Sequence, residues 1–380
     1  GMVDAPDGMV DAPDGMVDAP DGMVEPPTWD LHARRPPSPG YPEPMTSPDM
    51  VGLARIREAR LVIADRVHRT PILGSAAAAR LVTANRGVRL AGERLYLKAE
   101  HLQKTGSFKP RGMTARVASL SPDERRRGII TVSAGNAAQG YAFAGAALGV
   151  PVTVVMPAAA VRSKADAAAG YGARVVLEGD DFSATFAAMD RIREEEGLVF
   201  CHPFDDPDVI AGHGSAGLEL VEDLPEVDVV VVGIGGGGLI SGIAAAVKGV
   251  RPSTRIYGVE PVGSNAIQQG LAAGEPVSMV PVSVADGLNA PFAGLLPLAM
   301  IGAYVDDVIL IDDPTILGGL RFALERMKQV LEPAGAAALA ATLTGKIPVR
   351  EGETVVVVLS GGNVEVSRLG ELIAAAGPVI

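Results

Sequence analysis

The chain has 380 residues, of which 48% are hydrophobic and 4% aromatic, so it can bury a large core built mainly of aliphatic side chains. Its formal net charge is −12, with 33 basic and 45 acidic residues, which argues against nucleic acid or a membrane surface as the main partner. The single cysteine, Cys201, cannot form an internal disulfide, and no apolar run is long enough to span a bilayer. We therefore expect a cytoplasmic protein.

The N-terminal segment repeats seven residues, GMVDAPD three times and then GMVEPPT, over residues 1–28. A period of seven is typical of coiled coils, but each unit contains a proline and a glycine, which break helices. The segment stays rich in proline up to Pro48. We expect residues 1–48 to be a disordered tail.

From residue 50 onward, strand-like and helix-like segments alternate. Strands are predicted at 94–99, 128–132, 152–156, 174–177, 198–201, 227–232, 255–259 and 354–359. Helices are predicted at 51–67, 137–148, 162–171, 182–196, 213–224 and 239–250. Several strands are continuous valine and isoleucine runs, as in parallel sheets covered by helices on both faces. The fold class predicted is therefore α/β.

The first loop that indicates chemistry is Thr105-Gly106-Ser107-Phe108-Lys109-Pro110-Arg111-Gly112. A lone lysine is usually a solvated surface residue. An amine becomes a good nucleophile toward an aldehyde when burial or a nearby positive charge lowers its pKa. Phe108 and Arg111 are candidates to provide these two effects for Lys109.

The second loop joins a valine-rich strand to a helix and contains four consecutive glycines, Gly235, Gly236, Gly237 and Gly238. Their backbone N–H groups and the helix N-terminus favour a bound phosphate. The spacing Gly233-x-Gly235-x-x-Gly238, followed by Glu260 at the end of the next strand, also matches a dinucleotide fingerprint. An NAD-dependent oxidoreductase therefore stays open as an alternative from this loop alone.

Two further loops follow strands. Ser133-Ala134-Gly135-Asn136-Ala137 stands where a strand ends and a helix begins, and its small residues suit a carboxylate bound to backbone N–H groups. The other loop is Ser360-Gly361-Gly362-Asn363, after the last predicted strand. Open α/β sheets bind ligands at the carboxyl ends of their strands, where the Ser360 hydroxyl is expected.

Together the four loops resemble the threonine/serine ammonia-lyase (threonine dehydratase) family of fold-type II pyridoxal-phosphate enzymes, which also includes serine racemases. The resemblance runs from about residue 51 to 369 and includes further motifs. These motifs are Glu100-His101-Leu102-Gln103, Pro203-Phe204-Asp205, Val209-Ile210-Ala211-Gly212, Ala285-Asp286-Gly287-Leu288 and Glu332-Pro333-Ala334-Gly335.

The resemblance implies a tryptophan synthase β-like fold of two open parallel-sheet, three-layer domains. A small domain of residues 128–204 would be inserted into a large one made of 49–127 and 205–380. The resemblance also implies pyridoxal 5′-phosphate as cofactor, a homodimer, and loss of water from a β-hydroxy amino acid such as L-threonine or L-serine.

Site roles follow from the same resemblance. Lys109 would form the Schiff base with the cofactor and act as base at the substrate Cα. The other cofactor-binding residues would be Phe108, Asn136, Gly235, Gly236, Gly237, Gly238 and Ser360. The substrate-binding residues would be Ser133, Ala134, Gly135, Asn136 and Ala137. Ser360, a neutral partner for the ring nitrogen, favours elimination over transamination.

The chain departs from the family pattern at three positions, Ala134, Ala137 and His213. Ala137 stands where the family usually has histidine, which leaves dehydration of a bulkier hydroxy-amino acid and β-replacement open. His213 stands where the family often has glutamine, and Ala134 stands where serine racemases have a serine, so racemisation is expected to be weak or absent. No second carboxylate follows Glu260 closely, so no tight divalent metal site is expected, although a monovalent ion stays open.

Overall fold

The computed structural model describes residues 50–377, and the expected disordered tail, 1–48, lies outside them. The strands are β1 (Ile72–Ser75), β2 (Leu95–Lys98), β3 (Ile129–Val132), β4 (Val152–Met156), β5 (Arg174–Leu177), β6 (Val199–Phe200), β7 (Val229–Gly233), β8 (Arg255–Pro261), β9 (Asp307–Ile311) and β10 (Val355–Val358). The helices are α1 (Leu53–Ile63), α2 (Ala76–Arg86), α3 (Lys109–Ser119), α4 (Pro122–Arg127), α5 (Asn136–Leu148), α6 (Arg162–Gly170), α7 (Phe182–Glu196), α8 (Pro207–Asp223), α9 (Gly238–Val250), α10 (Ala266–Ala273), α11 (Leu295–Tyr304), α12 (Asp313–Phe322), α13 (Pro333–Leu343) and α14 (Val366–Ala375). Among the described residues, no helix has the length and apolar character needed to cross a membrane.

The larger sheet has the strand order β1-β2-β10-β7-β8-β9. Neighbouring strands from β2 to β9 run parallel, as predicted, whereas β1 joins the edge antiparallel to β2. The expectation of parallel sheets is therefore wrong for this one strand. β1 escaped prediction because it is a four-residue edge strand of mixed burial, without a valine and isoleucine run.

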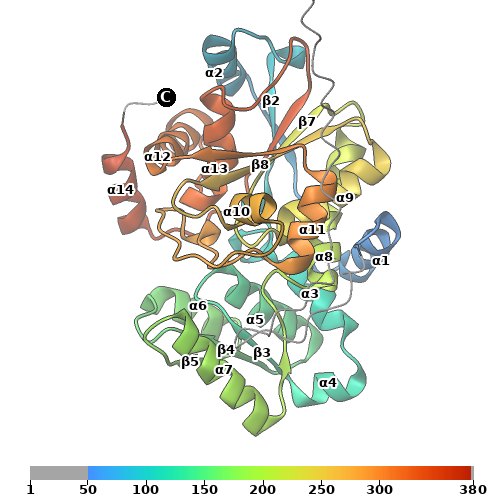
Figure 1. The fold of residues 1–380 in the computed structure, drawn as a ribbon, viewed down its shortest axis with the longest axis vertical. Helices are drawn as coiled ribbons and strands as arrows, with labels where there is room; N and C mark the ends of the chain where they lie inside the picture. The colour runs from blue at the N-terminus through green and yellow to red at the C-terminus, as the bar shows by residue number, and fades with distance from the viewer. Residues whose placement is uncertain (1–49, 378–380) are drawn as a thin grey trace, which may run out of the picture. The chain divides into compact units, whose positions relative to one another are not determined.

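Both faces of this sheet are buried, because successive side chains of a strand point to opposite faces. In β7, Val229 and Val231 pack into a core that contains residues of α2, α12 and α13. Val230 and Val232 pack into a second core, with residues of α8, α9 and α11. Figure 1 shows these helices on the two sides of the sheet. This arrangement explains why β7 reads as an unbroken valine run.

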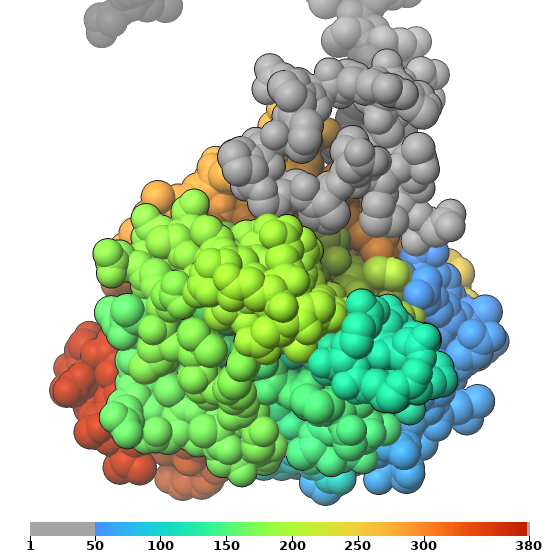
Figure 2. Space-filling view, turned by 90° about the horizontal axis from the view of Figure 1, so that it is seen from below, coloured from blue at the N-terminus to red at the C-terminus, as the bar shows by residue number. Residues whose placement is uncertain are grey.

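The second sheet has the order β5-β4-β3-β6, and its pairings are all parallel. Its strands fall within the predicted small domain, 128–204, with α5 and α6 packed on one face and α7 on the other. Residues of about 120–205 form most of the face seen in Figure 2. Met113 and Val117 of α3 also pack into the core of this sheet. The predicted domain limits assign α3 to the large domain, and they remain a prediction.

The predicted bounds of β4, β5 and α7 agree with the structure, but α8 begins at Pro207, six residues before the predicted start at residue 213. The Asp206 carboxylate accepts the N–H groups of Asp208 and Val209 and so caps the helix, while Pro207 suits its first turn. Both cap signals stand in the sequence, and the prediction was wrong because the glycines that follow conceal the helical period. The earlier start carries α8 past the first turn of α3.

Candidate active site

The loop that leads into α3, the turn after β10 and the helix α5, which follows β3, lie together. The backbone N–H of Phe108 donates to the carbonyl of Ser360 at 3.1 Å, and Ser107 forms an isolated bridge with Gly361. A Cβ built on Gly140 of α5 would lie 3.0 Å from the Cβ of Lys109. The structure therefore brings Lys109, the Ser360 turn and the start of α5 together, from parts of the chain up to about 250 residues apart.

Lys109 is the first residue of α3, and its Nζ donates to the carbonyl of Pro203 at 3.1 Å. The same nitrogen lies 5.0 Å from the centroid of the Phe108 ring. Burial among protein atoms lowers the pKa of Lys109 to about 8, against the opposing pull of the Glu332 carboxylate. A sizeable fraction of the amine is thus neutral near pH 8.

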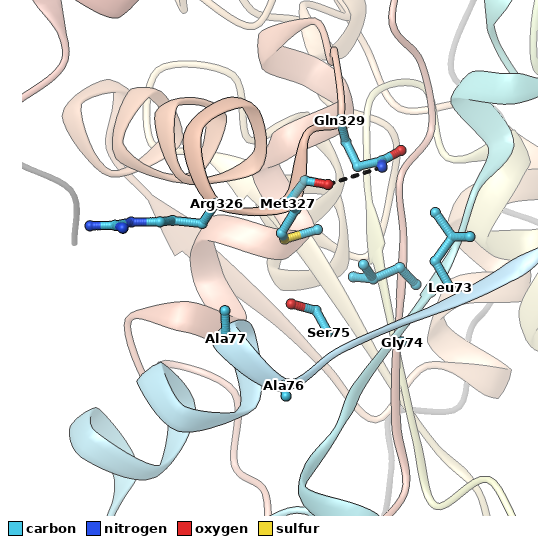
Figure 3. A pocket seen from close by; sticks show the side chains of 9 residues that line it. Leu73, Gly74, Ser75, Ala76, Ala77, Arg326, Met327 and Gln329 are labelled. Carbon is cyan, nitrogen blue, oxygen red and sulfur yellow. Dashed lines mark hydrogen bonds between the residues drawn. The ribbon is translucent and has the colours of Figure 1, made fainter.

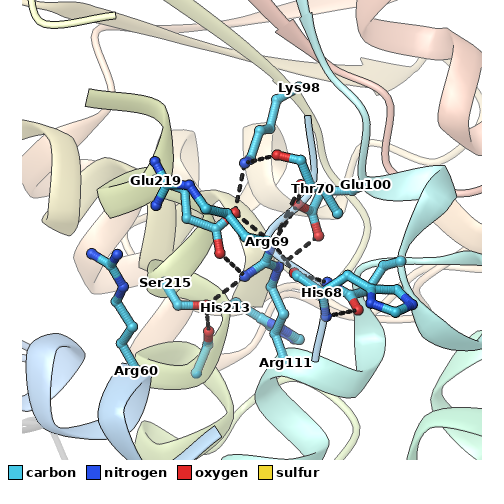
Figure 4. Close-up of polar contacts among 12 residues, drawn as sticks. Arg60, His68, Arg69, Thr70, Lys98, Glu100, Arg111, His213, Ser215 and Glu219 are labelled. Atoms are coloured by element: carbon cyan, nitrogen blue, oxygen red, sulfur yellow. Dashed lines mark hydrogen bonds and ion pairs between the residues drawn. The ribbon is translucent and has the colours of Figure 1, made fainter. Parts of the chain in front are cut away.

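Arg111 does not play its expected part in lowering this pKa. Its guanidinium is fully buried and bonded to the carboxylates of Glu100 and Glu219, at 2.7 to 2.9 Å. Lys98 adds a second buried cation, at 2.6 Å from Glu219. Figure 4 shows the four side chains as one network. Because two cations face two carboxylates, the Arg111 charge is compensated, and burial of the lysine lowers its pKa instead.

The glycine loop follows β7, and Gly237 has a left-handed φ of 89° just before α9 begins at Gly238. A Cβ on Gly236 would lie 2.3 Å from the Phe204 ring, and one on Gly238 would lie 2.8 Å from the Phe204 carbonyl oxygen. A Cβ on Gly235 would come within 3.1 Å of the Gly287 carbonyl oxygen. Side chains are therefore excluded from this loop, which leaves its backbone beside a helix N-terminus.

Asn136 opens α5 and makes two side-chain contacts. Its Nδ2 donates to Glu332 Oε1 at 2.7 Å, and its Oδ1 accepts from Asn363 Nδ2 at 2.8 Å. An amide carries two N–H donors, so one remains beside the Glu332 bond for the expected cofactor contact. Asn363 also donates to the carbonyl of Thr105 at 2.7 Å, which connects this group to the loop before Lys109.

The remaining predicted residues follow the carboxyl ends of β3 and β10. Ser133 Oγ accepts the Gly135 N–H at 3.2 Å, so the loop closes on itself before α5. Ala134 is partly buried and Ala137 is buried, both in contact with the core around α5. Ser360 is 6% exposed, and its Oγ lies 3.5 Å from the carbonyl oxygen of Ala334.

Glu332 and Phe204 belong to this group, although the sequence suggested no role for either. Burial, as the largest effect, raises the pKa of Glu332 to about 7. Phe204 packs against the glycine loop and within a group of rings that includes His202 and Phe292. Both residues stand in motifs of the family resemblance, which was the available signal. Their burial depends on distant segments and cannot be read from neighbouring residues.

Glu260, the acid of the dinucleotide alternative, is 1% exposed. Its two oxygens accept the backbone N–H groups of Ile267 and Gln268 at 3.0 and 2.9 Å, so it binds the start of α10. Among the described residues, no group of three or more histidine, cysteine, aspartate or glutamate side chains is arranged to hold a metal ion. Glu260 thus has a structural role that accounts for its burial.

A cavity of about 430 Å³ lies elsewhere, between β1, the start of α2 and residues 326–329. Figure 3 shows Ser75, Arg326 and Gln329 around it. Its lining contains none of the predicted site residues. It is therefore separate from the lysine site.

Comparison with known proteins places the chain in a family of enzymes. The family model described as "Pyridoxal-phosphate dependent enzyme" matches residues 67–361. The L-threonine ammonia-lyase of Thermotoga maritima is 42% identical over 326 residues, which cover 85% of this chain and 78% of that protein. The structure of maize serine racemase matches with a TM-score of 0.79 and 35% identity, over 86% of this chain and 98% of that one. The crystal structure of a T.th. threonine deaminase matches with a TM-score of 0.74 and 38% identity, over 83% of this chain and 99% of that one.

Proposed function

Because the chain belongs to the family of pyridoxal-phosphate dependent enzymes, we propose that it removes water from a β-hydroxy amino acid and releases ammonia and a 2-oxo acid. The observation that carries this proposal is the Lys109 amine, whose pKa is lowered to about 8 at the meeting point of the predicted loops. Similarity to an L-threonine ammonia-lyase and a threonine deaminase supports the choice of reaction.

The residues present fit pyridoxal phosphate. Lys109 offers a primary amine for the aldehyde, and the loop of Gly235 to Gly238 offers backbone N–H groups at a helix N-terminus for the phosphate. Ser360 would face the ring nitrogen, Phe108 would pack on the ring and Asn136 would bond its phenolic oxygen. When bound, the cofactor supplies an electron sink that makes the substrate Cα proton acidic.

The protein's own groups then move the proton and hold the substrate. Lys109 accepts the proton from Cα, the electron pair left behind forms the Cα–Cβ double bond, and the Cβ–O bond breaks. The departing hydroxyl takes up a proton and leaves as water. The released enamine is hydrolysed by water to ammonia and the 2-oxo acid. The loop Ser133, Ala134, Gly135, Asn136 and Ala137 is proposed to receive the substrate carboxylate.

Two alternatives differ in their support. Similarity to maize serine racemase favours racemisation as a second candidate, but Ala134 has no acid or base to act on the opposite face of Cα. The NAD-dependent alternative needs an acid to bind the ribose, but both oxygens of its candidate, Glu260, already accept backbone N–H groups. A homodimer and a cytoplasmic location remain predictions, the first from the family resemblance and the second from the lone Cys201.

The test is a panel of β-hydroxy amino acids that includes L-threonine, L-serine, phenylserine and hydroxyaspartate, assayed for 2-oxo acid and ammonia. We expect stoichiometric release with at least one member, and a fall of about 10²- to 10⁴-fold or more for Lys109→Ala. The control is Lys248→Ala, which removes a lysine of α9 that pairs with Asp306, and it should keep full activity. No release from any member by protein that binds pyridoxal phosphate at Lys109 would reject the proposal.

A further inference from the structure

His213 of α8 is completely buried next to the first turn of α3, at the contact that Figure 4 shows beside Arg111. Its Nδ1 accepts the backbone N–H of Gly112 at 3.1 Å. Its ring meets the Phe108 ring edge to face, with centroids 4.7 Å apart. Phe108 and Gly112 bracket Lys109 in the sequence, so one histidine contacts the chain on both sides of the lysine.

The hydrogen bond from Gly112 to His213 satisfies a backbone donor in the first turns of α3. The Gly112 N–H would ordinarily bond the Phe108 carbonyl four residues earlier, but that carbonyl accepts the N–H of Arg111 at 3.1 Å. His213 provides the missing acceptor from a different helix. Because Nδ1 accepts a hydrogen bond, the ring proton must be on Nε2 in the neutral form.

The ring has little freedom to move in this position. A Cβ built on Gly112 would lie 2.5 Å from His213 Cε1, so the imidazole rests directly against the α3 backbone. On the same contact, a Cβ on Gly212 would lie 2.4 Å from the Arg111 carbonyl oxygen. The two helices therefore approach at glycines, and His213 fills the space beneath Phe108.

The surrounding charges favour the neutral ring that this bond needs. Burial, then the positive charges of Lys109 and Arg111, hold the pKa of His213 well below its usual range. The Arg111 charge is itself paired with Glu100 and Glu219. A protonated ring would lose its acceptor at Nδ1 and would face two cations.

We propose that His213 is a positioning residue for Lys109: it holds the first turn of α3 and the Phe108 ring so that the lysine amine keeps its place at the Pro203 carbonyl. This inference rests on the proposed function for its kinetic consequence, though the position of the amine can be measured without it. An amine displaced by about 1 Å costs up to about 10²-fold in rate while substrate binding changes little.

Two substitutions separate the hydrogen bond from simple packing. His213→Leu keeps apolar bulk but has no acceptor, whereas His213→Gln keeps an acceptor oxygen without the ring. Leu218→Ala is the matched control for lost stability, because Leu218 lies on the same helix but in a core that contains neither Phe108 nor a residue of α3.

The first measurement uses cofactor-free protein. Lys109 is acylated with acetic anhydride across a pH series, and the midpoint of its reactivity is read by mass spectrometry. We expect the midpoint to rise in His213→Leu, because a displaced amine becomes more solvated, and to return toward the wild-type value in His213→Gln. Leu218→Ala should leave the midpoint unchanged.

The second measurement is steady-state kinetics of the holoenzyme with the most reactive amino acid of the panel. His213→Leu should lose about 10- to 100-fold in kcat with KM within about threefold, and His213→Gln should recover most of kcat. If His213→Leu does not fold, the inference is judged on His213→Gln, which must shift kcat less than about fivefold and retain the labelling midpoint.

The inference would be overturned if His213→Leu kept the wild-type labelling midpoint and kcat. It would also be overturned if His213→Gln and His213→Leu lost equal amounts of kcat. A shifted midpoint in a protein that eliminates water from no amino acid would support the positioning role while rejecting the proposed reaction. The two failures are thus distinguishable.

Discussion

The Lys109 site depends on two titratable groups whose environments move their pKa values toward each other. Burial lowers the pKa of Lys109 to about 8 and raises the pKa of Glu332 to about 7. Such paired shifts are typical of sites that transfer protons near neutral pH. The Glu332 carboxylate, bonded to Asn136, therefore belongs to the electrostatics of the site even though no chemical step is assigned to it.

The raised pKa of Glu332 predicts how stability depends on pH. Its pKa is about 7 in the folded protein and about 4.5 unfolded, so the folded state binds the proton more tightly. Its stabilising contribution is complete below pH 4.5 and is lost as the pH rises through 7, by at most roughly 3–4 kcal/mol. In Glu332→Gln this loss should disappear, as measured by urea unfolding at about pH 5 and about pH 8.

Glu260 has a similarly raised pKa of about 7 and should keep part of the slope in the Glu332→Gln variant. Glu58→Gln, on the exposed side of α1, serves as a control that should leave the slope as it is in the wild type. An unchanged slope in Glu332→Gln would contradict the burial argument.

From Ala134 we predict that the substrate is racemised much more slowly than it is deaminated. Without a proton donor on the face of Cα opposite Lys109, racemisation should be at least about 10²-fold slower than ammonia release, the factor that a positioned acid or base typically provides. Ala134→Ser should raise racemisation relative to elimination. Chiral chromatography of unreacted substrate checks both, and comparable rates in the wild type would refute the prediction.

At the scale of elements, α3 packs against α8, and Lys109 is the first residue of α3. Gly112 and Gly212 allow the two backbones to touch, and the buried network of Arg111, Glu100 and Glu219 crosses the same contact. Removing one partner of such a network leaves a buried charge uncompensated, which typically costs about 3–5 kcal/mol. The position of Lys109 at the start of α3 is thus tied to the tightly packed helix pair beside the site.

Two glycine substitutions test this packing. Gly212→Ala would bring a methyl group to 2.4 Å from the Arg111 carbonyl oxygen, and we expect it to destabilise the protein by about 1–3 kcal/mol. Gly170→Ala, at the end of α6, meets nothing within 4 Å and should be neutral or stabilising by up to about 1 kcal/mol. Urea unfolding of both variants decides, and equal effects would mean that the α3–α8 contact is looser than the structure indicates.

At the scale of the whole molecule, the proposed cofactor site joins segments that are far apart in the sequence. A ligand that binds only the folded protein adds about 2.7 kcal/mol at a concentration of about 100 times its Kd. We therefore expect removal of pyridoxal phosphate to lower Tm by several degrees, as measured by calorimetry of holo and cofactor-free protein. Lys109→Ala should gain less from the cofactor, and equal Tm values for the wild type with and without it would count against the site.

Much of the α/β architecture was predictable because local patterns carry it. The valine runs of β4, β7 and β10 predict strands buried on both faces, and the glycine loop after β7 predicts an anion site at a helix start. The sequence did not predict the strands β1 and β9 or the helices α2 to α4 and α10 to α14, among them the helix that begins with Lys109. Most of these elements are short, and short segments have weak local signals. The start of α8 was misplaced because the glycines after Pro207 conceal the helical period.

The sequence by itself was enough to propose the site residues Lys109, Asn136, Ser360 and the four glycines, because loop motifs consist of adjacent residues. Only the tertiary structure decided their surroundings. In the structure, Arg111 is paired with buried carboxylates and Glu332 accepts a hydrogen bond from Asn136. His213 accepts the Gly112 N–H of α3. Burial and pairing join residues about 100 to 200 positions apart, and the free energy of a charge depends on those neighbours rather than on the local sequence.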